Sequence, residues 1–358
     1  MPTLPLLASP ATYNPHTIDM VTDPQARHYW IDVFVNHLPS LKRHAIISEG
    51  DTDDARRRVD AMAAQFSRML DALRANADAF GHLSILRICE LREQCLREHH
   101  IADPYHHIKS MENEACLKLL PGVLAELDAI RNPRKLLETL IVGVFAGNVF
   151  DLGAAGTLAL YESGKMDYHD VRAKIKPRPW VVDDLGLLEG RWLDGLKLPG
   201  AVWKKAIVLV DNAGADVVLG MIPLCRELAK RGTRVFIAAN THPSLNDITF
   251  DALGPLLERI AAFDETVRDA VGDGRITPIA SGNDAPLIDL RNVSEELASA
   301  ARGADLLILE GMGRAIESNF DACFTCDTLK LAMIKEKHVA QTLHAEMYDV
   351  VCRFEMGR

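Results

Sequence analysis

Residues 206–214 read AIVLVDNAG, and this stretch decides the fold. The first five residues are all apolar, which is typical of a strand that is buried on both faces of a parallel sheet. Asp211-Asn212-Ala213-Gly214 then turns the chain into a helical pattern that continues to about Lys230. A buried strand that leads through a tight turn into a helix predicts an α/β architecture.

The same alternation of strand and helix extends through the C-terminal part of the chain. We expect extended segments at 180–184, 206–210, 233–239, 276–280 and 305–309, and helices at 136–150, 211–230, 250–271 and 294–302. Pro223 falls inside a helical pattern, so it should kink that helix or begin a new one. Residues 131–358 are therefore predicted to form a three-layer α/β/α domain around a mostly parallel sheet.

The N-terminal part has a different character. Residues 1–20 contain four prolines and little periodicity, and we expect an extended arm. Apolar residues then recur at helical spacing in 51–77, 84–98 and 107–127, with a break expected at Pro121-Gly122. Residues 1–130 are therefore predicted to form this arm and a helical subdomain.

Composition excludes several classes of protein. The 358 residues are 48% hydrophobic, enough for a large buried core, and carry a net charge of −10, which disfavours a nucleic-acid partner. No run approaches the roughly 20 apolar residues that span a bilayer, and no secretory signal is recognisable, so we expect a cytoplasmic protein that does not contact a membrane. Seven irregularly spaced cysteines are consistent with reduced thiols. The oligomeric state is left open.

Three polar clusters fall where predicted strands end. These clusters are Asp211-Asn212, the loop 240–247 that ends in Asn246-Asp247, and Glu310-Gly311-Met312-Gly313-Arg314. Because ligand sites of parallel sheets lie at the carboxyl ends of the strands, we expect the three clusters to converge. Each cluster alone is also explained by a helix cap or a polar turn, and for Asp211-Asn212 alone a helix cap is the more common explanation.

The convergent residues have the chemistry of a metal–anion site. Asp211, Asn212 and Asp247 would supply the hard oxygen ligands that Mg²⁺ prefers. Gly311 and Gly313 allow a close approach of the backbone, and Arg314 could clamp a phosphate. A P-loop motif GxxxxGK[ST] is absent from the sequence, and the GxG at 311–313 lacks the further features of a dinucleotide fingerprint.

Several motifs in order resemble the damage-control phosphatase family (DUF89) over most of the chain, from about residue 30 onward. The form of the 311–319 motif is similar to the subfamily that includes the C-terminal domain of animal pantothenate kinase 4 and stand-alone plant proteins. The motifs are Asp103-Pro104-Tyr105 with Lys109 and Glu112-Asn113-Glu114; Gly147-Asn148 with Asp151; Asp211-Asn212-Ala213-Gly214; Asn246-Asp247-Ile248-Thr249; Gly311-Met312-Gly313-Arg314 with Glu317 and Asn319; and Ile334-Lys335-Glu336-Lys337.

The resemblance implies an enzyme that hydrolyses phosphate monoesters of small metabolites with Mg²⁺, Mn²⁺, Co²⁺ or Ni²⁺, on an α/β domain with an N-terminal helical subdomain. Carried over by position, the resemblance implies that the metal ligands are Asp211, Asn212 and Asp247. It implies that the catalytic residues are Asp211, Asp247 and Lys335, and that Lys335 faces the phosphate. The substrate pocket would be lined by Asn113, Asn148, Asp151 and Asp216.

The expected mechanism is attack by a metal-activated water, with an aspartyl-phosphate on Asp211 as the alternative. Phosphopantetheine or its damaged forms, and sugar phosphates, are the expected substrates. We also hypothesise that the helical half closes over the sheet, so that Asn113 and the turn at 148–151 face the metal across a cleft.

Two other functions remain open at this stage. One is an adenosylmethionine-dependent carboxyl methyltransferase, although the second strand ends in Ala239-Asn240 and lacks the acidic residue that would bind the ribose. The other is a non-catalytic metal-binding regulatory protein.

Overall fold

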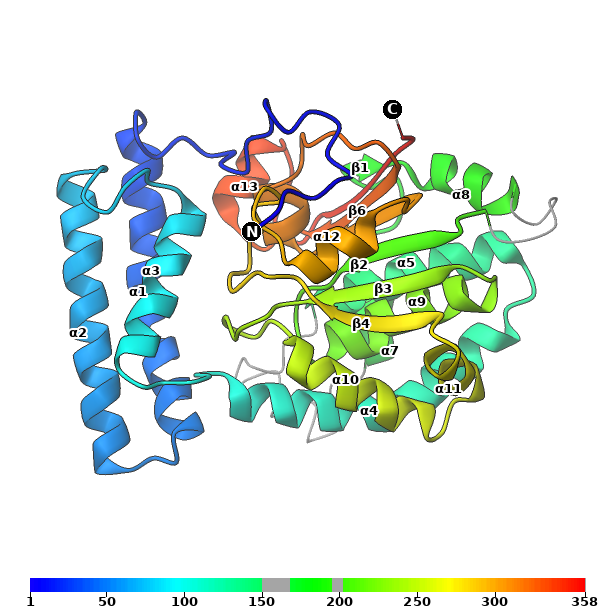
Figure 1. Ribbon diagram of the computed structural model, residues 1–358, viewed down its shortest axis with the longest axis horizontal. Helices are drawn as coiled ribbons and strands as arrows, with labels where there is room; N and C mark the ends of the chain where they lie inside the picture. The colour runs from blue at the N-terminus through cyan, green and yellow to red at the C-terminus, as the bar shows by residue number, and fades with distance from the viewer. Residues whose placement is uncertain (150–167, 195–201, 358) are drawn as a thin grey trace.

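The computed structural model describes residues 1–149, 168–194 and 202–357. These residues form a seven-stranded sheet of order β1-β7-β6-β5-β2-β3-β4 (Figure 1). The strands are β1 (Val182–Asp183), β2 (Lys205–Leu209), β3 (Arg234–Ala239), β4 (Ile276–Ala280), β5 (Leu306–Glu310), β6 (Asp327–Met333) and β7 (Val350–Glu355). Neighbouring strands are parallel except β6 and β7, which are antiparallel.

Strand β2 lies at the centre of the parallel part, between β3 and β5. Its side chains alternate between two buried clusters: Ala206 and Val208 join one, and Ile207 and Leu209 join the other. Because both faces are covered, every position of this strand from Ala206 onward can be apolar, as the sequence predicts. The position of β2 therefore determines where Asp211 lies at the carboxyl edge of the sheet.

Helices cover both faces of the sheet, which makes three layers. Cluster residues on one face come from α4 (His106–Ala129), α5 (Pro133–Val149), α7 (Tyr168–Lys174), α8 (Leu185–Asp194), α9 (Ile222–Lys230), α10 (Phe250–Ala261) and α11 (Glu265–Gly272). On the other face they come from α12 (Glu295–Ala301), α13 (Lys337–Thr342) and the N-terminal arm, and this second cluster continues into the three N-terminal helices described below. The predicted fold class is confirmed. Among the described residues, no helix combines the length and apolar character needed to cross a bilayer.

Three helices stand beside this body, at the left of Figure 1: α1 (Pro24–Ser48), α2 (Asp53–Ala75) and α3 (Ile85–Glu98). Each begins at a polar N-cap, namely Asp23, Thr52 and Ser84, whose side chain accepts a backbone N–H of the first turn. The arm before α1 stays on the α/β body, where the Leu4 N–H donates to the Leu290 carbonyl (2.8 Å). The chain therefore leaves the body after the arm and returns to it through α4. The boundary at residue 130 stays a prediction.

The helix α4 corrects one expectation, because it continues through Pro121-Gly122 without the predicted break. Proline removes one helical hydrogen bond. Here Leu117, Leu120 and Leu124 are buried in the core on both sides of Pro121, and this packing holds the helix together. The expectation for Pro223 is confirmed, since α9 carries a proline in its first turn and follows a short π-helix, η1 (Asp216–Met221).

Candidate functional site

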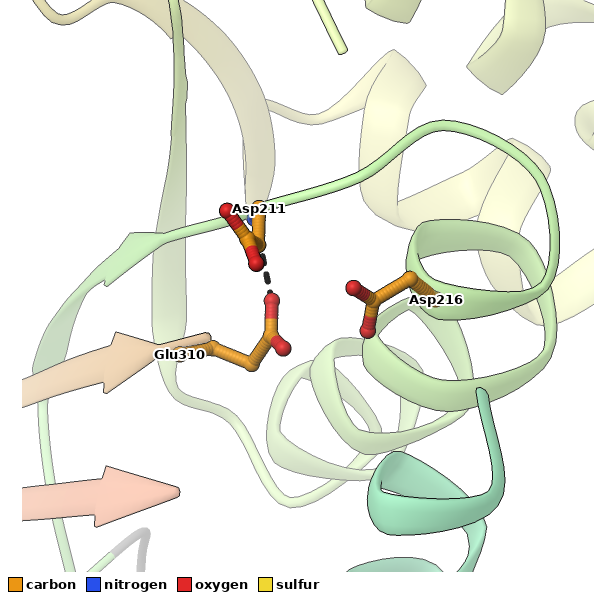
Figure 2. A group of neighbouring side chains, drawn as sticks. All are labelled: Asp211, Asp216 and Glu310. Carbon is orange, nitrogen blue, oxygen red and sulfur yellow. Dashed lines mark hydrogen bonds between the residues drawn. The ribbon is translucent and has the colours of Figure 1, made fainter. Parts of the chain in front are cut away.

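Three carboxylates gather at the carboxyl end of the central strands. Asp211 follows β2, Glu310 is the last residue of the neighbouring strand β5, and Asp216 begins η1. Figure 2 shows the three side chains from these elements near one another, and each offers an oxygen within 4.8 Å of the others. The Asp211 N–H donates to Glu310 Oε2 (2.9 Å). The pairing of β2 with β5 brings these residues together, because parallel neighbours end at one edge.

All three carboxylates are buried, and their charge is not balanced within the cluster. Burial raises the pKa of Glu310 well above its usual range, and the nearby carboxylates of Asp216 and Asp211 add to this. Burial also raises the pKa of Asp211, against the lowering effect of Arg314. The Oδ1 atom of Asp216 is buried and has no hydrogen-bond partner among the residues that the structure describes. An unpaired buried carboxylate oxygen is costly, so the arrangement favours a bound cation.

Two amides surround the same carboxylates. Asn148 Nδ2 donates to Asp216 Oδ2 (2.8 Å) and to Glu310 Oε1 (3.1 Å). Asn212 Nδ2 donates to Asp216 Oδ2 (2.8 Å). Oxygen-rich sets of this kind suit Mg²⁺ and similar divalent ions, so the residues present fit a divalent metal. The family resemblance predicts a substrate contact for Asp216, and the sequence assigns no role to Glu310. The position of Glu310 at the end of a strand that pairs with β2 is the signal that could have identified it.

The loops after β2 and β3 lie side by side, so Asp211, Asn212 and Asp247 come together as predicted. Asn212 and Asp247 form an antiparallel bridge, and the Ile248 N–H donates to the Asp211 carbonyl (2.9 Å). Burial raises the pKa of Asp247 to about 6, although Arg314 opposes this. Asp211 therefore belongs both to the predicted ligand set and to the carboxylate cluster with Asp216 and Glu310.

Arg314 joins the two halves of this site. Its Nη1 donates to Asp211 Oδ1, and its Nη2 donates to Asp247 Oδ2 (2.7 Å) and Asn240 Oδ1 (2.8 Å). The side chain is 1% exposed. In the structure this arginine is the counterion of two carboxylates, and the predicted contact with a substrate phosphate stays a prediction.

Gly311 precedes a second π-helix, η2 (Met312–Glu317). Its φ is +94°, and a Cβ atom there would collide with the carboxylate of Asp211. Both facts require glycine at this position. The close approach predicted for Gly311 is present, and it is made to Asp211. Gly313 also lies against backbone, since a Cβ there would collide with the Pro286 carbonyl.

The remaining predicted residues have distinct positions. Lys335 follows β6, is exposed, and donates from Nζ to the Asn148 carbonyl (2.9 Å). Asn113 in α4 accepts the Gly214 N–H at Oδ1 (2.8 Å), so it fixes the turn after β2. Gly214 has φ +73°, as the tight turn predicted there requires. Asp151 lies outside the described residues.

A cavity of about 370 Å³ opens in front of these groups. Asp211, Asn212, Asp247 and Lys335 line it from the sheet side, and side chains of α1 and α3 line it from the other. Glu317, from η2, also lines it. Burial raises the pKa of Glu317 to about 8, and the carboxylates of Glu336 and Asp211 contribute further. The cavity therefore offers one exposed lysine beside a group of buried acids.

Comparison with known proteins places this site in a family. Residues 33–351 match the model of the damage-control phosphatase ARMT1-like domain. Pantothenate kinase 2 of Arabidopsis thaliana is 45% identical over 99% of this chain and 42% of its own length. A damage-control phosphatase of the same plant is 40% identical over 91% of this chain and 87% of its own length.

Two further similarities extend the comparison. A mouse protein named 4′-phosphopantetheine phosphatase is 32% identical over 99% of this chain and 48% of its own length. Among solved structures, a DUF89 family protein of Pyrococcus horikoshii is similar with a TM-score of 0.63 and 18% identity, over 92% of this chain and 97% of that one. This last similarity concerns the fold alone. The chain thus spans less than half the length of the pantothenate kinase 2 and mouse relatives.

Proposed function

The chain belongs to the family of damage-control phosphatase ARMT1-like domains, and on that premise we propose that it is a metal-dependent phosphatase of small phosphorylated metabolites. One observation carries the proposal beyond family membership. Asp211, Asp216 and Glu310 form a buried carboxylate cluster next to a cavity that Lys335 lines, and one oxygen of the cluster has no hydrogen-bond partner within the described part of the chain. The carboxylate cluster suits a bound cation, and the cavity beside Lys335 suits a phosphate dianion.

Two sets of side-chain oxygens could hold a divalent ion, and Asp211 belongs to both sets. One is the cluster with Asp216 and Glu310, and the other is the family-like set with Asn212 and Asp247. Mg²⁺, Mn²⁺, Co²⁺ and Ni²⁺ are the candidates. Held by these residues, an ion of this kind would neutralise phosphoryl oxygens and lower the pKa of a water molecule.

The protein's own groups perform the remaining tasks. Lys335 lines the cavity and would neutralise a phosphate oxygen there, and its contact with the Asn148 carbonyl would orient it. Asp247 or Asp211 orients the attacking water, and the alternative is that Asp211 attacks the phosphorus directly. Because phosphoryl transfer depends on charge neutralisation and positioning, these few groups suffice for the reaction.

Phosphopantetheine, its damaged forms and sugar phosphates are the substrates to test first. The name of the mouse relative supports the first class. The methyltransferase alternative is not favoured, because β3 leads into Asn240, whose amide binds Arg314 and Asp247, and no acidic residue follows that strand directly.

The decisive experiment is a phosphate-release assay. The purified protein is incubated with Mg²⁺, Mn²⁺, Co²⁺ or Ni²⁺ and a panel of phosphate monoesters, with EDTA as control. We expect EDTA-sensitive release, and we expect Asp211→Ala to abolish both turnover and metal binding while the circular dichroism spectrum is unchanged. Metal binding without turnover on any ester would instead favour the non-catalytic regulatory protein. Normal metal-dependent activity in Asp211→Ala would refute the assigned site.

A further inference from the structure

Glu317 is an acid of the cavity to which the reaction described so far gives no task. It is the last residue of η2, is 7% exposed, and lines the cavity together with Asp211. Its carboxyl forms no hydrogen bond or ion pair with any residue that the structure describes. Burying a polar group without a partner is costly, so a carboxyl in this position points to a role in function.

The charges that act on this carboxyl show which way it faces. They belong to Glu336, Asp211 and Lys335, and all three residues line the same cavity. The carboxyl at the end of η2 therefore lies beside the lysine that would meet the phosphate.

The backbone that carries Glu317 is held in place on both sides. The Thr17 hydroxyl donates to the Glu317 carbonyl, and Asn319 Nδ2 donates to the Arg314 carbonyl (2.9 Å). Arg314 is itself fixed by the carboxylate of Asp211. One rigid segment thus directs a guanidinium to the buried carboxylates and a carboxyl to the cavity, and such fixed placement is what a proton donor needs.

The surroundings of Glu317 favour its protonated form. Burial raises the pKa of its carboxyl to about 8, the charges of Glu336 and Asp211 raise it further, and Lys335 opposes them. Cys89 of α3 also interacts with it electrostatically, but burial raises the pKa of that thiol to about 12, so the thiol is neutral. A carboxyl that keeps its proton at neutral pH can donate it during a reaction.

The other acids of the cavity already accept hydrogen bonds. Asp211 and Asp247 both accept from the Arg314 guanidinium, which favours their ionised form. Glu336 accepts the Tyr29 hydroxyl at Oε1. The carboxyl at the end of η2 is therefore the one best placed to act as a donor.

We propose that Glu317 is the general acid of the reaction and protonates the leaving oxygen of an alkyl phosphate. This assignment rests on the proposed phosphatase function. As a water oxygen bonds to phosphorus, the bond from phosphorus to the ester oxygen breaks, and the Glu317 proton passes to that ester oxygen, which leaves as an alcohol. One proton of the water stays on the phosphate, the other passes to solvent, and Glu317 regains a proton from solvent. The transfer to the ester oxygen is the same if Asp211 attacks in place of water.

Esters whose leaving groups differ in their need for a proton test the assignment. 4′-Phosphopantetheine and ribose 5-phosphate would release alkoxides, which need the proton, whereas p-nitrophenyl phosphate releases a stable phenolate, which does not. We expect Glu317→Gln to lower kcat on the alkyl esters by about 10²-fold to 10⁴-fold, and on p-nitrophenyl phosphate by less than about threefold. Glu317→Met, which carries no polar atom into the buried site, is the second variant if the amide unfolds.

A series of aryl phosphates extends the comparison to a slope. The logarithm of kcat is plotted against the pKa of the leaving phenol, and Glu317→Gln should make the slope steeper, because the leaving oxygen then departs with its full negative charge. Glu336→Gln removes another carboxyl of the same cavity and should leave the slope unchanged. A general structural defect lowers every rate by one factor and also leaves the slope unchanged.

Infrared difference spectroscopy detects the proton without catalysis. We expect the spectrum of the Mg²⁺-loaded wild-type protein at neutral pH, minus that of Glu317→Gln, to contain the C=O stretching band of a protonated carboxyl. The same subtraction with Glu336→Gln gives the reference for a carboxyl that already accepts a hydrogen bond.

The outcomes separate the two proposals. An equal loss of kcat on alkyl and aryl esters in Glu317→Gln, an unchanged slope, or the absence of the protonated-carboxyl band overturns the general acid while the phosphatase function stands. A wild-type protein that releases phosphate from no ester, p-nitrophenyl phosphate included, overturns the phosphatase function, and the proton transfer is overturned with it.

Discussion

Arg314 illustrates, at the scale of one residue, how the site is held together before any ligand binds. The guanidinium lies between the carboxylates of Asp211 and Asp247, which follow two neighbouring strands. Both acids would otherwise be buried charges without a counterion. Removing one partner of a buried ion pair costs much more than removing one on the surface. This arginine is therefore expected to support the stability of the protein as well as its site.

The first prediction concerns this side chain. Replacing Arg314 with Met should lower the free energy of unfolding of the metal-free protein by about 3–5 kcal/mol, since two buried carboxylates lose their counterion. Urea denaturation measures the change. Arg259→Met is the matched control, because Arg259 pairs with Glu114 in an exposed ion pair and should cost less than about 1 kcal/mol. An equal loss of unfolding free energy in both variants would mean that Arg314 does not act as the counterion of Asp211 and Asp247.

The sequence predicts most of these residues but not their partners. Asp211, Asn212, Asp247 and Arg314 stand out because they follow predicted strands. The contact of Arg314 with two carboxylates depends on how three loops are placed relative to one another, which no local pattern records. Lys335 was identified through the family resemblance alone, because nothing in its own neighbourhood marks it as a site residue.

At the scale of the element, the turn from β5 into η2 depends on Gly311. The positive φ and the nearby Asp211 carboxylate are two separate reasons for glycine. Gly303 has φ +70° and no atom within 4 Å of a built Cβ, so it has only the first reason. Comparing alanine variants of Gly303 and Gly311 therefore separates the cost of a left-handed backbone from the cost of a steric collision.

The second prediction follows from this comparison. Gly303→Ala should destabilise the protein by about 1–2 kcal/mol through the left-handed backbone alone. Gly311→Ala should cost clearly more and should also disturb the carboxylate cluster, because the methyl group displaces Asp211. Thermal unfolding and Mn²⁺ affinity measure the two effects. A Gly311→Ala protein that matches Gly303→Ala in stability and retains wild-type Mn²⁺ affinity would contradict the close packing.

The elements themselves were predictable where burial is simple. Strands β2, β3, β4 and β5 lie within a residue or two of the predicted segments. The apolar runs of β2 and β5 reflect burial on both faces, whereas the edge strand β4 is only partly buried. β6 was not predicted, since it contains Lys330, which is fully buried and pairs with Glu355 of β7 (2.9 Å). Because Lys330 of β6 and Glu355 of β7 form this ion pair, each strand contains a charged residue that interrupts its apolar run, and the sequence pattern of a buried strand is lost.

At the scale of the whole molecule, stability and metal binding should be linked. A ligand that binds only the folded state raises the free energy of unfolding by about 2.7 kcal/mol at a concentration of 100 times its Kd. The third prediction is that Mn²⁺ raises the melting temperature of EDTA-treated protein. Differential scanning calorimetry at several Mn²⁺ concentrations measures it.

Two carboxamide variants control this measurement. Glu310→Gln removes a buried carboxylate of the cluster and should abolish most of the Mn²⁺-dependent rise. Glu265→Gln removes an exposed carboxylate on α11 and should leave the rise unchanged. If Glu310→Gln keeps the full increase in melting temperature, the ion does not bind at the Asp211–Asp216–Glu310 cluster.

The relation between the two parts of the molecule was only partly predictable. The sequence indicates a helical half, and the family resemblance suggests that it faces the metal through Asn113. In the structure the wall opposite the site comes from α1 and α3, whereas Asn113 of α4 supports the turn at Gly214. The substrate contact of Asn113 stays a prediction. Helical periodicity shows that α1 has an apolar face, but it cannot show which part of that face lines a cavity.

The path of the chain through α1–α3 has a consequence for how such proteins diversify. The three helices form one uninterrupted stretch, entered after the arm at Asp23 and left before α4 at His106. Every described carboxylate of the cluster lies outside this stretch. Mutations in one contiguous block of the gene can therefore change the side of the cavity that α1 and α3 line, while the carboxylates of the cluster stay intact. A chimera that exchanges only residues 24–98 between two relatives would therefore test whether this stretch sets substrate preference.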